Sequence, residues 1–450
     1  MYEEEDIVEI SLWDKDIFIG KCAINLFRLE KEKTHRIRVK LEDDMSHIQI
    51  FVLLTISGLQ LENTVVDLDD YQREQNRIEI MRKKLAWYRV KNEDSTVGYL
   101  SIIVYGAKGL SGQDCYCALE LGNDRLQTHT DFKTNNPNWM KAFSFKVTDI
   151  ATILEVSVHD ERKNEIVGKL SIPLLKISSV EKQWYALKDF AQRERAKGNN
   201  PRILLELKVT WNLIKSSLRV LKPKEPIYLQ TNKKLDRQVF SRNLTRAKAV
   251  NTWILDSLQV VKTCFAWDDW RWNVTTLVLW ISLCWSFRPW MLPLFLLLPF
   301  MWYKPSKFTL LNWKKYLRQE PEESEEKEEI KSVSLRQKIH SIQEMIQSVQ
   351  NAIGVYASLA ERIKNLFNFT TPYLSCLAIF LCLMLSFLMY LIPVRLILTI
   401  WALHKFIRKI IQPNRISNNE ILDLLSRVPD DDILIECEEI PLEYSNEDDD

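Results

Sequence analysis

The sequence predicts an all-β sandwich followed by an α-helical membrane region with two apolar segments or hairpins. Short runs of alternating apolar residues fill residues 98–211, and two long apolar runs follow at 274–303 and 373–403. About eight short antiparallel strands over one such stretch are typical of a two-sheet sandwich. The long runs exclude a wholly water-soluble chain, because a far larger protein would be needed to bury them.

The strand pattern is clearest in six runs that place every second residue on one face. They are Tyr99–Val104, Cys115–Leu121, Ala142–Val147, Ile153–Val158, Ile166–Ile172 and Ile203–Val209. Turn signals separate these runs, so we expect a sandwich domain that stands alone.

Residues 7–56 repeat the latter half of this pattern. Glu9–Asp14 followed by Phe18–Ile24 parallels Glu155–Asp160 followed by Ile166–Ile172. The front half of the fold has no counterpart in this copy, so its sheet would carry unpaired edges. We therefore interpret the first copy as a partial domain and expect the chain to start inside a domain.

Each long apolar run exceeds the roughly 20 residues that cross the hydrocarbon core of a bilayer. The first run holds 22 apolar residues and the second holds 26, with one charge in each. Arg288 and Pro289 interrupt the first run, and Pro393 and Arg395 interrupt the second. Because proline and arginine are costly inside a span, we favour two shallow hairpins with these residues at their tips over two single spans. In either arrangement both chain ends face the same side.

The segment before the first apolar run is basic. Residues 214–262 carry eleven Lys or Arg and three Asp or Glu. These cations either face solvent or lie on anionic headgroups, where each contributes about 1 kcal/mol. The candidate lipid-binding residues of this segment are Lys222, Lys224, Lys233, Lys234 and Arg237.

Between the apolar runs, an acidic spacer precedes an apolar stripe with 3,4 spacing. The stripe predicts one amphipathic helix over 335–367. Its apolar seam needs a partner, which is either another helix, including a second copy of this chain, or the membrane interface. The chain ends in the acidic tail Asp430–Asp450, for which we expect disorder.

Charge and side-chain chemistry narrow the function. The net charge is +1, so charge gives no support for nucleic-acid binding. The eight cysteines fit a reducing compartment rather than a disulfide scaffold. His129 and His159 lie on or beside strands with no nucleophile at a defined spacing, so we interpret them as structural and expect no enzyme.

These patterns divide the chain into eight parts. The predicted parts are a partial domain (1–59), a charged linker (60–96), the sandwich (97–213), a basic juxtamembrane region (214–273), membrane segment 1 (274–303), the acidic spacer with the amphipathic helix (304–372), membrane segment 2 (373–403) and a C-terminal region with the acidic tail (404–450).

The motifs of the sandwich resemble those of a C2 domain. They are Gly98–Val104, Gly109-Leu110, Asp114–Tyr116, Thr134–Trp139, Leu154–Asp160 and Gly168–Pro173. Further motifs resemble the C-terminal region of the multiple C2 domain and transmembrane region proteins. They are Phe265–Asp268, Ile342–Glu344, Ser348–Asn351, Glu361–Asn365 and Asn419–Pro429. The resemblance implies a calcium- and lipid-responsive protein anchored in the endoplasmic reticulum, in a family linked to synaptic transmission in animals and to membrane contacts in plants.

The resemblance also implies a calcium site built from acids of two loops. Calcium takes roughly 6–8 oxygen ligands, so several carboxylates must converge. This copy keeps Asp114 in the first loop and Asp160 in the third, but Arg162 and Asn164 stand where the family pattern has aspartates. We expect calcium to bind here poorly or not at all.

The remaining loop residues have two interpretations. Arg162 and Lys163 either contact acidic phospholipid without calcium or are ordinary exposed loop residues. The partial first copy keeps Asp14 and Asp16 of its own third loop but has no first loop to complete a calcium site.

Together these expectations describe a lipid-binding tether or scaffold of the endoplasmic reticulum membrane, acting in calcium-linked membrane trafficking or synaptic transmission. Its sandwich and C-terminus face the cytosol, and its expected partner is anionic phospholipid, with no nucleic acid. Self-association through 335–367 is a further expectation. The alternative is a reticulon-like protein that shapes membranes with paired hairpins.

Overall fold

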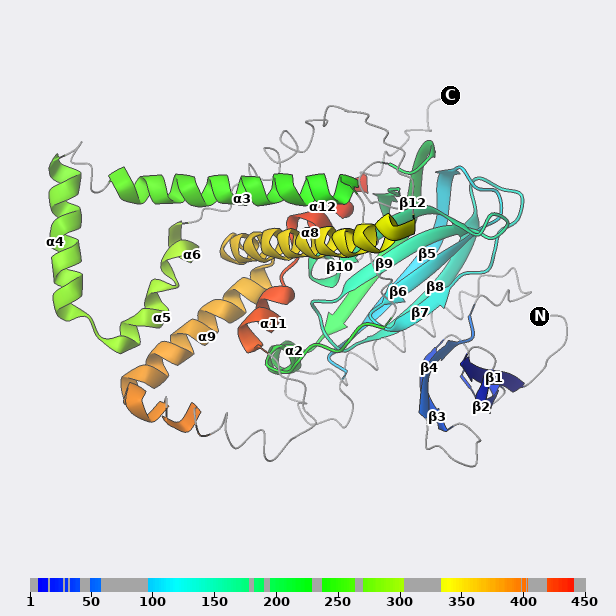
Figure 1. The fold of residues 1–450 in the computed structure, drawn as a ribbon, viewed down its shortest axis with the longest axis horizontal. Coiled ribbons are helices and arrows are strands. Elements are labelled where there is room, and N and C mark those ends of the chain that lie inside the picture. The colour runs from blue at the N-terminus through cyan, green and yellow to red at the C-terminus, as the bar shows by residue number, and fades with distance from the viewer. Residues whose placement is uncertain are drawn as a thin grey trace, which may run out of the picture. The chain divides into compact units, whose positions relative to one another are not determined.

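The computed structural model describes most of the chain and divides it into two units (Figure 1). Unit 1 comprises Met1–Gln230 and Asp432–Asp450, and unit 2 comprises Thr231–Asp431. The described residues are 7–14, 17–26, 29–30, 33–40, 49–57, 96–177, 182–189, 195–228, 237–263, 270–302, 333–397, 399–401, 403 and 419–440.

Unit 1 holds the predicted C2 sandwich, with two antiparallel sheets in the order β10-β9-β6-β7 and β13-β11-β12-β5-β8. The strands are β5 (Gly98–Leu110), β6 (Cys115–Leu121), β7 (Asp124–Gln127), β8 (Asn138–Val147), β9 (Ile153–Asp160), β10 (Glu165–Pro173), β11 (Gln183–Ala186), β12 (Gly198–Trp211) and β13 (Glu439–Ile440). The short helices η2 (Leu174–Lys176) and α2 (Leu213–Val220) complete the domain. All six predicted runs lie within these strands, so the predicted sandwich is confirmed.

Alternation of side chains explains why these segments pair as strands. Along β5, Leu100, Ile102 and Val104 are fully buried while the intervening residues face outward. The inward faces of both sheets form one apolar core, whose burial drives the pairing.

The first copy forms two hairpins. Strand β1 (Ile7–Asp14) pairs antiparallel with β2 (Ile17–Asn25), and β3 (Thr34–Lys40) pairs antiparallel with β4 (Gln49–Thr55). The pairs β9–β10 and β11–β12 of the C2 sandwich follow the same order. The linker 60–95 lies outside the described residues.

The C-terminal tail departs from the expected disorder. Residues Asp431–Glu436 form helix α12, and β13 pairs with β11 at the edge of the C2 sandwich. Backbone pairing with a preformed strand explains the order, because so short a strand in an acidic sequence carries no strand signal of its own. Residues 441–450 lie outside the described part.

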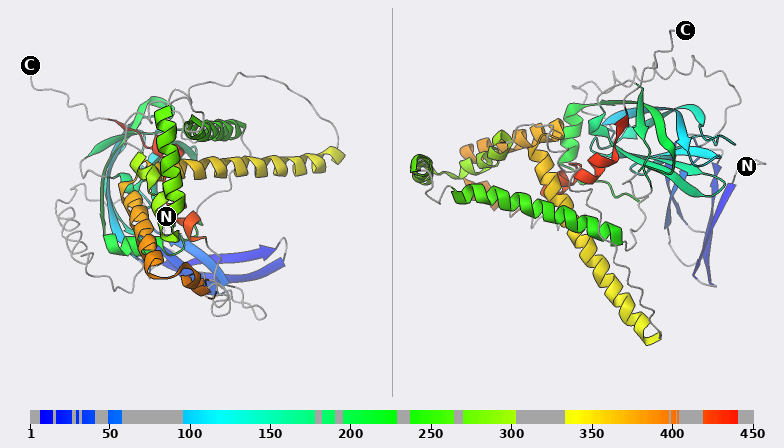
Figure 2. Two further views of the ribbon diagram at one scale, coloured as in Figure 1. Left: turned by 90° about the vertical axis from the view of Figure 1, so that its left-hand side faces the viewer. Right: turned by 90° about the horizontal axis from the view of Figure 1, so that it is seen from above.

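Unit 2 is helical. Its helices are α3 (Arg237–Thr263), α4 (Trp270–Ser286), η3 (Pro289–Met291), α5 (Leu292–Phe295), α6 (Leu298–Trp302), α8 (Val333–Phe367), α9 (Pro372–Leu391) and α11 (Glu420–Ser426). The predicted helix over 335–367 is present as α8. Helices α3 and α11 both pack against α8, and Figure 2 shows α3 and α8 crossing.

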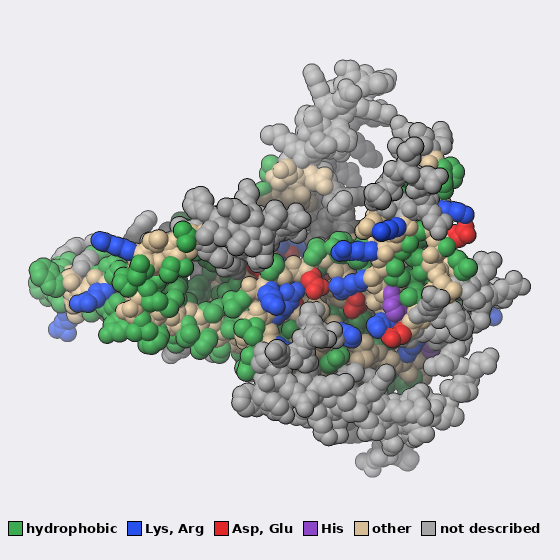
Figure 3. Space-filling view, turned by 90° about the horizontal axis from the view of Figure 1, so that it is seen from below, with side chains coloured by type: hydrophobic (Ala, Val, Ile, Leu, Met, Phe, Trp, Pro, Cys, Tyr) green, Lys and Arg blue, Asp and Glu red, His purple; other side chains and the backbone are tan. Residues whose placement is uncertain are grey.

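One helix among the described residues, α9, is long and apolar enough to cross a membrane, and 273–282 and 289–301 are shorter apolar helices. Apolar side chains gather over the α4 and α9 part of the visible surface (Figure 3). Leu279 and Trp285 of α4 and Phe387 of α9 are more than half exposed. Exposed apolar patches of this kind are typical of surfaces that bind a membrane or another protein.

Both apolar segments break at the predicted prolines. Helix α4 ends at Ser286, and helical structure resumes with η3 at Pro289. Helix α9 ends at Leu391, just before Pro393. In the second segment the break follows 20 helical residues rather than dividing the run at its middle. Helix α9 therefore accommodates Pro393 and Arg395 beyond its C-terminal end.

The chain after the first break runs antiparallel to α9, and Figures 1 and 2 show the two side by side. Near the breaks, the Ser386 hydroxyl donates to the carbonyl of Trp290 at 2.8 Å, and the Trp290 and Tyr390 rings meet edge to face at 5.9 Å. At the other end, the rings of Phe300 and Phe367 lie 4.7 Å apart. The two breaks therefore lie at the same end of this helical pair.

Candidate functional site

The loop edge of the C2 sandwich brings together the acids of the predicted calcium positions. Antiparallel pairing of β6 with β9 places Cys115 opposite Asp160, so Asp114 at the start of β6 lies beside the end of β9. The Glu161 N–H donates to the carbonyl of Asp114 at 2.8 Å. The sheet register thus positions both carboxylates.

The Asp160 carboxylate caps the turn that follows it. Its side chain is buried, and Oδ1 accepts the N–H groups of Arg162 at 3.0 Å and Lys163 at 3.3 Å. The turn closes with Asn164 at φ 53°, a left-handed conformation that asparagine tolerates well. Asp160 therefore acts as a structural cap.

The Asp114 carboxylate is also engaged. Its Oδ1 accepts the N–H of Lys133 at 2.9 Å, and its Oδ2 lies 3.9 Å from Nε of Arg162. The Arg162 side chain is 78% exposed, so its guanidinium lies near the acid and remains accessible to a ligand outside the protein. Lys163 beside it is exposed as well.

A third acid, Asp131, belongs to this edge and was missed by the sequence analysis. Its Oδ2 accepts the N–H of Asn138 at 3.0 Å. Burial, followed by the charges of Asp160, Asp114 and Asp131, raises the pKa of the Cys115 thiol to about 12. The thiol therefore stays protonated and is a poor metal ligand.

These residues do not fit a calcium ion. Calcium needs several carboxylate oxygens free to turn toward one point. Backbone N–H groups bind Asp114, Asp131 and Asp160, and a fixed cation adjoins Asp114. Within the described part of the chain, no group of three or more His, Cys, Asp or Glu side chains is arranged to hold a metal.

The other predicted residues belong to other elements of the chain. Asp14 ends β1, Lys222 and Lys224 are exposed, and Arg237 begins α3. Asp16, Lys233 and Lys234 lie outside the described residues. The predicted tips Arg288, Pro289, Pro393 and Arg395 are all exposed at the two helix breaks.

His159 has a nearby hydroxyl that the sequence spacing did not indicate. Its Nε2 lies 2.9 Å from the Ser157 hydroxyl, and its ring stacks on Tyr116. Burial lowers the pKa of His159, and that of His129 as well. Ser157 is itself buried, which agrees with a structural role for this pair.

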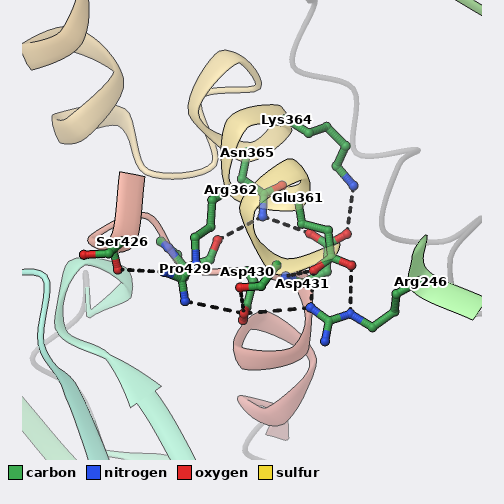
Figure 4. Close-up of polar contacts among 10 residues, drawn as sticks. Arg246, Glu361, Arg362, Lys364, Asn365, Ser426, Pro429, Asp430 and Asp431 are labelled. Atoms are coloured by element: carbon green, nitrogen blue, oxygen red, sulfur yellow. Dashed lines mark hydrogen bonds and ion pairs between the residues drawn. The ribbon is translucent and has the colours of Figure 1, made fainter. Parts of the chain in front are cut away.

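Unit 2 contains a second polar site, the α8 cluster, which is formed by α3, α8 and the chain after α11 (Figure 4). At its centre, the Arg246 guanidinium of α3 donates to both carboxylate oxygens of Glu361, with Nε to Oε1 at 2.8 Å. Glu361 is fully buried and also accepts the N–H of Asp431 at 3.2 Å. Such a bidentate, charge-assisted pair is among the strong polar contacts of a protein.

The rest of the α8 cluster ties the residues after α11 to α8. Lys364 binds Asp431 at 2.8 Å, Asn365 donates to the Pro429 carbonyl at 3.0 Å, Ser358 donates to Asp430 at 2.7 Å and Arg362 donates to the Ser426 carbonyl at 3.2 Å. These contacts explain the motifs Glu361–Asn365 and Asn419–Pro429 physically, because each motif supplies partners for the other.

The α8 cluster corrects the predicted seam of α8. Val349 and Tyr356, which belong to the apolar stripe with 3,4 spacing in the sequence, are each 45% exposed, whereas Gln350, Ala357 and Glu361 are buried. The buried line follows helical spacing, but it is partly polar, so a search for apolar stripes passes over it. The sequence does show Glu361 and Lys364 at helical spacing and two acids at 430–431, but these positions do not indicate which residues pair.

Comparisons with known proteins agree with this architecture. Residues 98–187 match the family model of the C2 domain, and residues 322–429 match a model described as plant phosphoribosyltransferase C-terminal. A multiple C2 and transmembrane domain-containing protein of Drosophila melanogaster is 38% identical over 98% of this chain and 50% of its own length. Multiple C2 and transmembrane domain-containing protein 1 of Homo sapiens is 36% identical over 98% of this chain and 46% of its own length.

The chain is thus a homologue of the multiple C2 and transmembrane domain-containing proteins. The resemblance predicted from its motifs is confirmed. The chain spans about half the length of the curated relatives it matches. The sequence holds 10 glycines and no glycine-rich phosphate loop with paired acids, so the description of the second family model supports no catalysis.

The solved structures that are similar to this chain include C2 domains of extended synaptotagmins. A C2 domain of plant extended synaptotagmin 1 is 24% identical over 26% of this chain and 96% of that structure, with a TM-score of 0.23. A calcium-bound pair of C2 domains from extended synaptotagmin 2 is 19% identical over 46% of this chain and 70% of that structure, with a TM-score of 0.24.

Proposed function

We propose that this chain is a non-enzymatic tether or scaffold anchored in the endoplasmic reticulum membrane, whose C2 sandwich binds anionic phospholipid without calcium in membrane trafficking. The observation that carries the proposal is the loop edge of the C2 sandwich. There the acids are bound by backbone N–H groups, while Arg162 and Lys163 face outward. In a calcium-binding C2 domain, bound calcium attracts lipid phosphates only when calcium is present. Here the side chains of Arg162 and Lys163 attract lipid phosphates at all times.

The basic residues after the sandwich support the same proposal. Lys222 and Lys224 are exposed, and Lys233, Lys234 and Arg237 follow them toward the first membrane segment. Cations that lie on an anionic membrane surface contribute about 1 kcal/mol each. Together with the loop edge, they give the chain a second means of holding a bilayer besides its apolar segments.

The test uses the full chain in uncharged vesicles, mixed with labelled acceptor vesicles rich in phosphatidylserine. We expect capture of the acceptors with or without calcium, and a roughly tenfold weaker capture for Arg162→Gln/Lys163→Gln because two surface cations are lost. Lys21→Gln/Lys146→Gln, which removes the same charge at exposed positions away from the loop edge, is the matched control. Capture that requires calcium would overturn the proposal.

The α8 cluster supports the two-hairpin arrangement of the membrane region. Arg246 precedes the first apolar segment, Glu361 lies between the segments, and Asp430 follows the second, yet all three belong to one buried cluster. A single cluster lies on a single side of a membrane. Each apolar segment therefore returns to the side from which it entered.

The helix breaks favour membrane shaping as a second function. Two segments that turn at exposed Arg288–Pro289 and Pro393–Arg395 form paired wedges, which occupy one leaflet more than the other. The tether and the wedge share the two-hairpin arrangement, so shaping adds to anchoring rather than replacing it.

A further inference from the structure

The outer edge of β11 holds a strand from the far end of the chain. The eight strands β5–β12 already form two complete four-stranded sheets, and β13 adds a ninth strand beside β11. The register pairs Trp184 with Ile440, and the Ala186 N–H donates to the carbonyl of Glu438 at 3.0 Å. The added strand thus satisfies an edge that the C2 sandwich would otherwise leave open.

Side chains of the sandwich extend the recognition beyond the ladder. Three donors bind three backbone carbonyls of the added segment. The pairs are Lys176 Nζ with the Cys437 carbonyl at 3.2 Å, Gln183 Nε2 with the Ile440 carbonyl at 2.8 Å and Lys188 Nζ with the Ile435 carbonyl. Every peptide has backbone carbonyls, so these contacts do not depend on particular side chains of the segment. Lys176 and Gln183 bind carbonyls of its non-helical part, and Lys188 binds a carbonyl at the C-terminal end of α12.

Charge adds selectivity for an acidic segment. The Glu438 carboxylate lies 3.8 Å from Nζ of Lys188 and 3.5 Å from the guanidinium of Arg195. Lys188 is only 4% exposed, and a buried ammonium is costly unless acceptors surround it. Cys437, 5% exposed, supplies an apolar anchor next to the acid. The backbone hydrogen bonds between β11 and β13, the buried Lys188 and the Glu438 carboxylate together form a binding site.

We propose that the outer edge of β11, with Lys176, Lys188 and Arg195, is a strand-binding site for an acidic segment, and that Ile435–Ile440 of this chain, in which the end of α12 leads into β13, is its ligand. The ligand is separable from the fold, because the two sheets are complete without it. The site belongs to the class of β-augmentation sites, in which the main chain gives affinity and side-chain contacts give selectivity. It lies on β11 and is independent of the lipid-binding loop edge at Arg162.

The first test is amide hydrogen exchange of the full chain. Glu438→Lys places a cation against Lys188 and Arg195, so we expect the amides of 183–188 to exchange at least roughly tenfold faster than in the unaltered chain. Glu9→Lys is the matched control, because it makes the same charge change at an exposed residue of β1, a strand that pairs with β2 and not with β11. We expect it to leave the exchange within about twofold. Equal exchange in both variants would overturn the charge-selective site.

The second test separates the ligand from the chain. A chain ending at Asp432 keeps the α8 cluster but lacks the segment, and we expect its 183–188 amides to lose protection while those of β5 and β12 keep theirs. A synthetic peptide of residues 433–440 should restore the protection, and the same peptide with Glu438→Lys should not. A truncated chain that stays fully protected, or a peptide without effect on folded protein, would refute the proposal.

Discussion

At the scale of residues, the same chemistry serves different purposes in the two units. On the loop edge of the C2 sandwich, Asp114 and Asp160 bind backbone N–H groups and leave Arg162 exposed. In the α8 cluster, Glu361 binds a guanidinium away from water. The exposed cation is available to a ligand, whereas the buried pair fixes one arrangement of helices.

Removing one member of the buried pair should destabilise unit 2. Glu361→Gln keeps the shape of the side chain but leaves the buried charge of Arg246 without its carboxylate, so we expect a loss of roughly 3–5 kcal/mol of stability. Thermal unfolding of the detergent-solubilised chain measures the loss. Asn351→Ala, at an exposed position of the same helix, should change the unfolding temperature little. Comparable losses in both variants would contradict the role given to Glu361.

The loop-edge residues were predictable and the α8 cluster was not. Asp114, Asp160, Arg162 and Lys163 adjoin strands whose alternation is visible in the sequence, so their loops could be located in advance. The partner of Glu361 lies 115 residues away on another helix. Local spacing carries no information about a pairing at that separation.

At the scale of elements, α8 is held to α3 by close approach of the two helices. Gly354 faces Asn243 of α3, and a Cβ at this glycine would lie 2.8 Å from the Asn243 amide nitrogen. Ala247 and Val250 of α3 are also buried. The glycine therefore sets the distance between the helices.

A larger side chain at this contact should separate α3 from α8. For Gly354→Leu we expect a loss of about 1–3 kcal/mol of stability from overpacking, read as a lower unfolding temperature in detergent. Val355→Leu adds bulk at the next residue, which is 67% exposed, and is the control. A Gly354→Leu chain as stable as the control would show that the helices do not need this approach.

The membrane elements followed their sequence closely. Proline and arginine end α4 and α9 where the residue types predicted a break. The second break does not divide its apolar run at the middle. Helix α9 is long enough that Pro393 and Arg395 lie at its C-terminal end. Helix length sets where a break lies in the bilayer, and residue type alone does not.

At the scale of the whole molecule, the α8 cluster carries the proposed membrane topology. Helices α3, α8 and α11 precede, separate and follow the two apolar segments, and α8 packs against both of the others. Because one packed cluster occupies one side of a membrane, the middle segment should share the cytosolic side with both chain ends.

Protease treatment of sealed microsomes tests this topology. With epitope tags at both ends and one inserted in the acidic spacer 320–329, we expect protease to remove all three tags while a lumenal marker survives. Asn368, which begins the N-glycosylation sequence Asn368-Phe369-Thr370, should carry no sugar, because glycosylation takes place in the lumen. Protection of the spacer tag alone would indicate two single spans and would contradict the topology drawn from Arg246, Glu361 and Asp430.

The sequence by itself determined the elements of this protein: alternating runs became the strands of the C2 sandwich, long apolar runs became the apolar helices α4–α6 and α9, and a 3,4 stripe became α8. The tertiary structure decided how distant parts meet. It selected the polar face of α8 for burial, paired Arg246 with Glu361, and docked β13 on β11 from the far end of the chain. Periodicity reports only which face of a segment is apolar, whereas hydrogen bonds and ion pairs between distant residues depend on geometry that only the folded chain provides.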